Sequence, residues 1–284
     1  MRTRWEALLL PPLLVSFLLF AVPQLVFLRM SLFKDLGLGQ VGSRLELGNY
    51  LEFVRDPFYL RSLALTAFLS ALVVVVALLL GYPLAYLLAR MRARFASLLL
   101  AVLVTTSFVT VVVKVLGLII VFSANGPLNR LLVGTGLIER PIQLLGNRSG
   151  VVIGLLHYTM AFMVLVLLSV IQTIPRSLEE AAQIHGASRW RVFRRIVIPL
   201  SLPGVIVGCM IVFNMSMGAF TSAALLGGGK VLTLPVLIQR TIMLETRYGM
   251  GAALSAILLV AVFFINLLSV GLLSRLRGAR GLAA

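Results

Sequence analysis

Residues 62–89 read SLALTAFLSALVVVVALLLGYPLAYLLA, a run of 28 positions without an acidic or basic side chain. A helix needs about 20 apolar residues to cross the hydrocarbon core of a bilayer, so this run is long enough for one crossing. Within a bilayer every backbone polar group must be satisfied internally, which a helix achieves and a single strand does not. The run therefore predicts a membrane-spanning helix.

Further windows of the same kind lie along the rest of the chain, one of them interrupted only by Lys114. Each window suffices for one crossing, and none is long enough for two helices and a turn. We therefore predict an all-α membrane protein with six transmembrane helices, forming a single domain over residues 1–284. The predicted spans are about 7–28, 64–88, 98–122, 151–172, 202–225 and 252–273.

The composition excludes a soluble enzyme, because 60% of residues are hydrophobic, 12% are charged and the mean hydropathy is +1.07. Soluble domains carry about 25% charged residues. The net charge of +16 is typical of nucleic-acid binding as well, but the basic residues lie between apolar runs, so we expect a lipid partner and no nucleic acid. One cysteine, Cys209, and two distant histidines, His157 and His185, predict no metal site.

The distribution of Lys and Arg orients the chain. With both termini inside, the cytoplasmic pieces hold 13 Lys or Arg in 54 residues, and the external pieces hold 11 in 89. Cytoplasmic loops are enriched in Lys and Arg, so both termini are predicted to be cytoplasmic.

The chain carries no recognisable energy source of its own. No predicted loop exceeds about 35 residues, which is too short for a soluble domain with its own core. The glycine run before Lys230 lacks the earlier Gly and the following Ser or Thr of a phosphate loop. The predicted helix interiors contain no Asp or Glu, the usual groups of ion-coupled carriers. A transporter built on this chain would take its energy from another polypeptide.

The cytoplasmic loop at residues 175–200 reads PRSLEEAAQIHGASRWRVFRRIVIPL. Ser177 and Glu180 have the spacing of a capping box, which predicts a short helix beginning there. Gly186 is placed to end that helix in the left-handed conformation, and Ser188 to cap a second one. One face of the second helix carries Trp190, Phe193 and Val197.

This loop resembles the EAA loop of the membrane subunits of binding-protein-dependent ABC importers, whose fold is called MetI-like. The resemblance rests on Glu180-Ala181-Ala182, Gly186 and Ile196-Val197-Ile198-Pro199, about seven positions over 20 residues. Ile198 stands where the family usually has Leu, and Gln183-Ile184-His185 lacks the acidic residue that many members carry.

Shorter motifs elsewhere look like the spermidine/putrescine-type branch of these permeases. They are Asn49-Tyr50, Asp56-Pro57, Gly81-Tyr82-Pro83-Leu84-Ala85-Tyr86, Asn125-Gly126-Pro127-Leu128-Asn129, Gly218-Ala219-Phe220 and Leu225-Leu226-Gly227-Gly228-Gly229-Lys230.

The resemblance implies a non-enzymatic subunit of the bacterial inner (plasma) membrane that forms half of a pathway for a polyamine-like or other small organic solute. Its partners would be a second permease chain, an external solute-binding protein and two ATP-binding subunits, which bind the ATP and Mg; this chain would hold no cofactor. The loop would form the coupling helices between the fourth and fifth spans. The carboxylate of the EAA motif would pair with an arginine of the ATPase or cap its own helix. The implied coupling residues are Glu179, Glu180, Ala181, Ala182, Gly186, Ile196 and Pro199.

Polar residues inside the predicted spans are candidates for the solute pathway: Lys114, Asn214, Ser216 and Thr221. Each has an alternative interpretation. Lys114 is either a pathway or gate residue or a structural cation held by carbonyls or a partner chain, and a pathway cation would disfavour a polyamine. The polar residues of the fifth span either line the path or bond neighbouring helices.

Glycine pairs at spacing four, Gly150 with Gly154 and Gly204 with Gly208, indicate helix-packing notches. His157 and Asn266 are interpreted as hydrogen-bonded bundle residues.

Three other interpretations remain. The loop would be only a capped connector, or the chain a stand-alone channel or secondary carrier, or an intramembrane enzyme. The acid-free spans argue against a carrier, and the lack of a clustered nucleophile, base or metal set argues against an enzyme.

Overall fold

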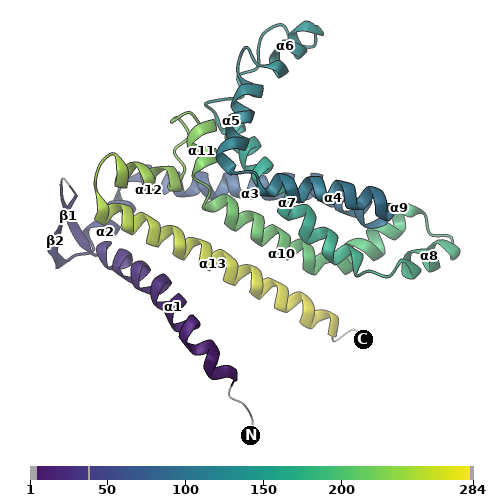
Figure 1. Ribbon diagram of the computed structural model, residues 1–284, viewed down its shortest axis with the longest axis horizontal. Helices are drawn as coiled ribbons and strands as arrows, with labels where there is room; N and C mark the ends of the chain where they lie inside the picture. Colours follow the sequence, from purple (N-terminus) through teal and green to yellow (C-terminus); the bar gives the residue numbers. More distant parts are fainter. Residues whose placement is uncertain (1–4, 38, 282–284) are drawn as a thin grey trace. The chain divides into compact units, whose positions relative to one another are not determined.

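The computed structural model describes residues 5–37 and 39–281 (Figure 1). It divides into two compact units. The first comprises the chain up to Leu63 with Leu234–Ala261, and the second comprises Ala64–Thr233 with the chain from Val262. Helices α3 (Pro57–Arg90) and α13 (Tyr248–Gly281) contribute to both units.

Within the described residues, six helical segments are long and apolar enough to cross a membrane, which confirms the predicted number. Several extend beyond the predicted bounds, because charged or polar turns continue the helix past the apolar window. The segments are Leu10–Met30, Pro57–Arg90, Val111–Gly134, Arg148–Gln172, Arg189–Met217 and Tyr248–Gly271.

The first unit contains a feature that the sequence did not predict, an antiparallel hairpin after helix α1 (Trp5–Met30). Its strands β1 (Phe33–Gly37) and β2 (Gln40–Leu45) pair with Phe33 opposite Leu45. Gly39 in the turn has φ +77°, a conformation that glycine adopts without steric cost. Two helices complete the unit besides the parts of α3 and α13, namely α2 (Gly48–Arg55) and α12 (Leu234–Met243).

An acidic side chain of the hairpin fastens it to the start of α13. Asp35 accepts hydrogen bonds from the backbone N–H groups of Gly249 (2.7 Å) and Met250 (2.9 Å). Carboxylates are favourable at a helix N-terminus, where these N–H groups have no partner within the helix. Arg247 binds both carboxylate oxygens of Glu52, at 2.8 and 3.0 Å. Hydrogen bonding to Glu52 raises the pKa of the Arg247 guanidinium above its ordinary value.

Two of the short motifs order the chain in this unit. The amide of Asn49 donates to the carbonyls of Ser31 and Phe33, both at 2.9 Å, and holds the end of α1 beside α2. Asp56 accepts from the N–H of Phe58 at 2.9 Å and so satisfies a donor in the first turn of α3. These motif residues therefore have structural roles.

The second unit is built on helix α7 (Arg148–Gln172), which packs along α10 (Ile198–Met217) (Figure 1). The two helices approach closely because α10 carries glycines at the contact. A Cβ added at Gly204 would lie 2.6 Å from Val170, and one at Gly208 would lie 3.0 Å from the sulfur of Met163. This pair is confirmed as a helix-packing notch.

The predicted third span, 98–122, is wrong as a continuous helix. It divides into α4 (Ala93–Phe108) and α5 (Val111–Phe122), with Val109 and Thr110 in extended conformations. Thr106 and Ser107 bond the carbonyls one turn back at 2.7 and 2.9 Å, and a β-branched run follows. Such hydroxyls compete with the helical ladder, and β-branched residues lose side-chain freedom in it, so the helix ends here.

The predicted fifth span, 202–225, is also interrupted. Helix α10 ends at Met217, and α11 (Thr221–Leu226) begins after Gly218 at the C-cap. Helix α11 lies against both α5 and α7.

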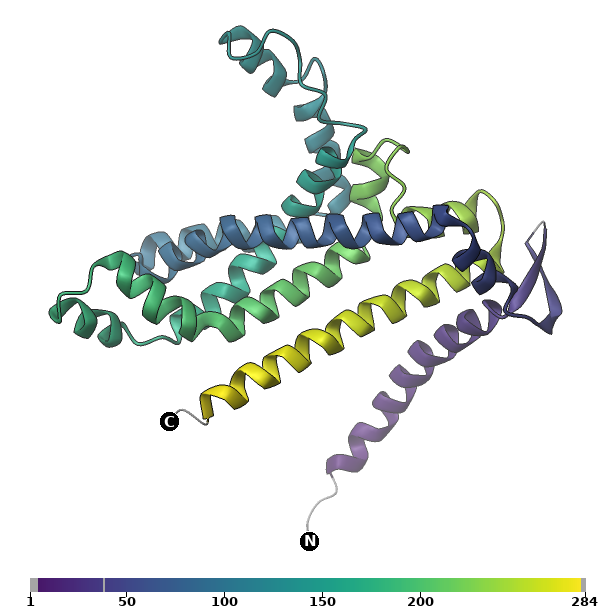
Figure 2. The same cartoon turned by 180° about the vertical axis from the view of Figure 1, so that it is seen from behind.

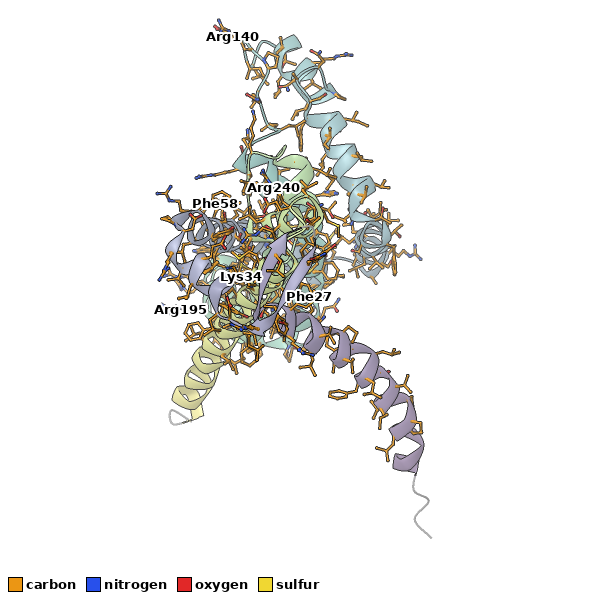
Figure 3. The ribbon with its side chains drawn as sticks, turned by 90° about the vertical axis from the view of Figure 1, so that its left-hand side faces the viewer. Phe27, Lys34, Phe58, Arg140, Arg195 and Arg240 are labelled. Carbon is orange, nitrogen blue, oxygen red and sulfur yellow. The ribbon has the colours of Figure 1, made fainter. Side chains whose placement is uncertain are left out.

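A projection built from α5 and α6 (Pro127–Gly134) extends away from α7 and α10 in both views (Figures 1 and 2). Asn129 organises it, accepting from the N–H of Ile142 at 2.8 Å and donating to that residue's carbonyl at 3.1 Å. Arg140 lies at its tip (Figure 3).

Candidate functional site

The first helix of the loop is α8 (Arg176–Ile184), which begins one residue earlier than predicted. Pro175 occupies the N-cap position and no side chain caps the helix there, so the predicted capping box of Ser177 and Glu180 is wrong. Proline fixes φ near its helical value and replaces the cap as the start signal. The contacts that hold α8 against α3 come from Glu179 and Arg176.

The predicted end of α8 at Gly186 is confirmed. Gly186 has φ +82°, and its N–H donates to the carbonyl of Gln183 at 2.9 Å. The N–H of Ala187 donates to the carbonyl of Ala182 at 3.0 Å, which completes the Schellman pattern of a helix end. No atom lies within 4 Å of a Cβ built at Gly186, so the backbone conformation, not crowding, requires glycine.

The second helix of the loop, α9 (Arg189–Val192), is capped as predicted. Ser188 Oγ accepts from the N–H of Arg191 at 3.3 Å. A π-helical turn, Phe193–Val197, joins α9 to α10, with Ile196 half-buried in it and Pro199 at the start of α10. Trp190 stacks on Phe193 at 5.6 Å, in agreement with the shared face.

The last turns of α3 carry a stripe of three polar side chains, Tyr82, Tyr86 and Arg90, one turn apart. We call it the α3 stripe. The rings of Tyr82 and Tyr86 meet the ring of Phe193 edge-on, at 5.5 and 5.1 Å. Arg90 forms an ion pair with Glu179, its Nε donating at 2.8 Å, and Tyr86 donates to the other carboxylate oxygen at 3.0 Å.

An open groove of about 860 Å³ lies between the end of α3 and the loop. It contains charges of both signs, Arg90, Arg176 and Glu179, beside the rings of Tyr86 and Trp190. Arg176 also donates to the carbonyl of Ala89 at 3.2 Å, a second tie between α8 and the end of α3.

Most of α8 faces outward. Glu180 and Ala181 are exposed and Ala182 is half-buried, whereas Glu179 is 7% exposed. The carboxylate of Glu180 therefore does not cap α8, the role that the sequence predicted for it. Ile184 is 85% exposed, the more exposed of the two large apolar side chains of α8. The sequence signal for this exposed side chain is an apolar residue two positions before the glycine that ends the helix.

The pathway candidates lie away from this loop. Lys114 is half-buried on α5, and the ion pairs of the described residues do not include it. Thr221 begins α11, and Ser216 Oγ is buried without a hydrogen-bond partner among the described residues.

Asn214 and Asn266 bond each other. Each amide nitrogen donates to the other's oxygen at 3.0 Å, and Asn266 also donates to the carbonyl of Val262 at 2.8 Å. This arrangement agrees with the interpretation of these residues as links between helices.

Comparison with known proteins identifies the family. The family described as "Binding-protein-dependent transport system inner membrane component" matches residues 77–278. The spermidine/putrescine transport system permease protein PotB of Haemophilus influenzae is 30% identical over 93% of both chains. PotB of Escherichia coli K12 is 34% identical over 76% of this chain and 78% of its own. The sulfate transport system permease protein CysW of E. coli K12 is 29% identical over 76% and 73%.

Solved structures show the same fold. A bacterial alginate ABC transporter in complex with a periplasmic protein bound to an alginate pentasaccharide superimposes with a TM-score of 0.78, covering 93% of this chain and 92% of the other at 20% identity. The MetNI methionine ABC transporter gives 0.59, covering 76% and 94% at 16% identity.

Members of this family are transport subunits, so the alternatives of a stand-alone carrier and an intramembrane enzyme no longer apply. The family that the EAA loop resembles is therefore confirmed as the family of this chain. The chain belongs to the binding-protein-dependent transport system inner membrane components, the multi-pass permease subunits of ABC importers.

Proposed function

We propose that this chain forms half of the translocation pathway of an ATP-driven importer and that α8 and α9 couple it to the ATPase. The observation that carries the coupling role is the exposed surface of α8. A short polar helix presents small and apolar side chains, Ala181 and Ile184, to the outside and ends in an uncrowded glycine turn. Small residues allow a partner to approach the helix backbone closely.

The proposed assembly contains a second, related permease chain, two ATP-binding subunits that hold ATP and Mg, and an external solute-binding protein. Support comes from the family description, which names a binding protein, and from the alginate transporter, which was solved with a periplasmic protein. The proposal puts both termini in the cytoplasm, which the Lys and Arg distribution supports, and α8 would then face the ATPase.

The proposed cargo is a small organic solute of polyamine type. The names of the two PotB relatives support it. The proposed pathway residues are Ser216 and Thr221, with Asn214 as a helix link beside them. Lys114, whose charge would disfavour a polyamine, is either a gate residue of this path or a structural cation. Purified importer in vesicles, supplied with its cognate binding protein, should accumulate radiolabelled spermidine or putrescine. Accumulation of sulfate instead would contradict a polyamine cargo.

The coupling role is tested by two variants of the outward surface, Glu180→Lys and Gly186→Trp. Each should separate ATP hydrolysis from solute transport in vesicles while the subunit still inserts, because the altered surface lies outside lipid. Ser43→Lys, on the exposed hairpin, is a matched control that should transport normally. Normal transport by both loop variants would contradict the coupling role.

A further inference from the structure

The α3 stripe makes hydrogen bonds at three successive positions, one to the start of α10 and two to the loop. Tyr82 Oη and Ser201 Oγ lie 2.6 Å apart, which ties the stripe to the start of α10. Tyr86 and Arg90 both bind the carboxylate of Glu179 in α8. Since the three stripe residues are four positions apart, they lie on one face of α3, and that face contacts α8, Phe193 and the start of α10.

By their chemistry, the two contacts with Glu179 are stronger than the contact of Tyr82 with Ser201. Two oxygens of one carboxylate accept from a guanidinium and a phenol, and Arg90 also donates to the carbonyl of Ile174 at 3.2 Å. Charge-assisted bonds of this kind are about twice as strong as neutral ones. Glu179 is also buried, so the loss of Arg90 would leave the carboxylate as an uncompensated charge out of water.

The aromatic contacts give the loop a second attachment to the same helix. Phe193 lies between α9 and the stripe, with its ring against Tyr82 and Tyr86. Both loop helices are thereby fastened to α3, although the chain itself continues into α10. A displacement of α8 has two routes into the helices: along the backbone into α10, and across the ion pair into α3.

We propose that Arg90 and Glu179 are positioning residues that make α3 move with α8, so that α3 receives the motion of the ATPase directly. This inference rests on the proposed coupling role of α8. The ion pair fixes α8 against the end of α3 through the carboxylate of Glu179. The exposed side of α8 stays available to the ATPase. Glu180, the acid of the EAA spacing, faces outward, and Glu179 beside it faces inward.

The test uses the complete importer in vesicles. It measures how strongly the cognate binding protein, added as it is purified, stimulates ATP hydrolysis. Arg90→Gln and Glu179→Gln should each lower this stimulation about fivefold or more, the low end of coupling between interacting sites. The exchanged pair, Arg90→Glu with Glu179→Arg, should recover a large part of it. Arg94→Gln, which changes an exposed arginine four residues further along the chain in α4, is the matched control and should behave as wild type. The yield of assembled complex is measured beside each value.

Gly186→Trp separates the inference from the function on which it rests. Loss of stimulation in Gly186→Trp with wild-type stimulation in Arg90→Gln and Glu179→Gln would overturn the inference and leave the coupling role intact. Wild-type stimulation in Gly186→Trp would contradict the coupling role itself.

Two milder variants keep the test decisive if Arg90→Gln fails to assemble. Arg90→Lys retains the charge without the two-nitrogen geometry, and Tyr86→Phe removes only the phenol donor. Stimulation should fall in both while the yield of complex holds. Wild-type stimulation in both would overturn the inference.

Discussion

Asn214 of α10 and Asn266 of α13 exchange two amide hydrogen bonds, each 3.0 Å long. The pair occupies polar groups that would otherwise be available to a passing solute. The sequence left open whether Asn214 lines a path or bonds a neighbouring helix, and this geometry favours the bond between helices.

We expect Asn214→Leu to destabilise the subunit, because it leaves the Asn266 side chain without its main partner. Hydrogen bonds between membrane helices contribute about 0.6 kcal/mol on average and about 1.7 kcal/mol at most. The double variant with Asn266→Leu should regain thermal stability and should transport normally. Poor transport by a stable double variant would return Asn214 to the pathway.

Lys114 gives a second prediction, because it is a half-buried cation outside the ion pairs of the described residues. If it lines the pathway, Lys114→Met should reduce transport much more than it reduces assembly, and Lys114→Arg should restore part of it. Lys230→Met, which changes an exposed lysine, is the control. Full transport and full assembly in Lys114→Met would identify a structural cation instead.

The orientation of the chain is a third prediction. In a Cys209→Ala background, cysteines at Ser43 and Glu139 should react with an impermeant maleimide in intact cells. A cysteine at Met91 should react only after permeabilisation. All three positions are exposed, so access depends on the side of the membrane. The reverse labelling pattern would contradict the predicted topology and put both termini outside.

The fourth prediction concerns the bidentate pair of Arg247 with Glu52. Hydrogen bonds to charged groups contribute about 1.5–3 kcal/mol, and an exposed ion pair contributes about 0–1 kcal/mol. Arg247→Met should therefore lower the melting temperature more than Arg240→Met, which removes an exposed pair with Glu245 at 3.5 Å. Equal shifts would show that the bidentate geometry adds nothing.

The sequence predicted those parts of the loop that depend on local chemistry. Gly186 and Ser188 end and begin helices through their own backbone and side-chain bonds, so a reading of a few residues was sufficient. The ion pair of Arg90 with Glu179 joins residues 89 positions apart, and no local pattern indicates such a partner.

The interruptions of two helices and the hairpin were missed for a different reason. Windows free of charge measure how long an apolar stretch is, but they do not register hydroxyl groups that compete for backbone carbonyls. Thr106 and Ser107 end α4 in this way inside an apolar stretch. The hairpin at Phe33–Leu45 lies in a segment that was read only as a connection between spans.

The seating of the ATPase on α8 can be measured directly with a photo-crosslinking residue at Ile184, whose side chain is 85% exposed. In membranes containing the whole importer, illumination should join this chain to the ATP-binding subunit. The same residue at Ile142, in the external projection, should not make that product. Capture of the ATP-binding subunit from Ile184 alone is the result that the coupling role predicts. Its absence from Ile184, or its appearance from Ile142, would contradict it.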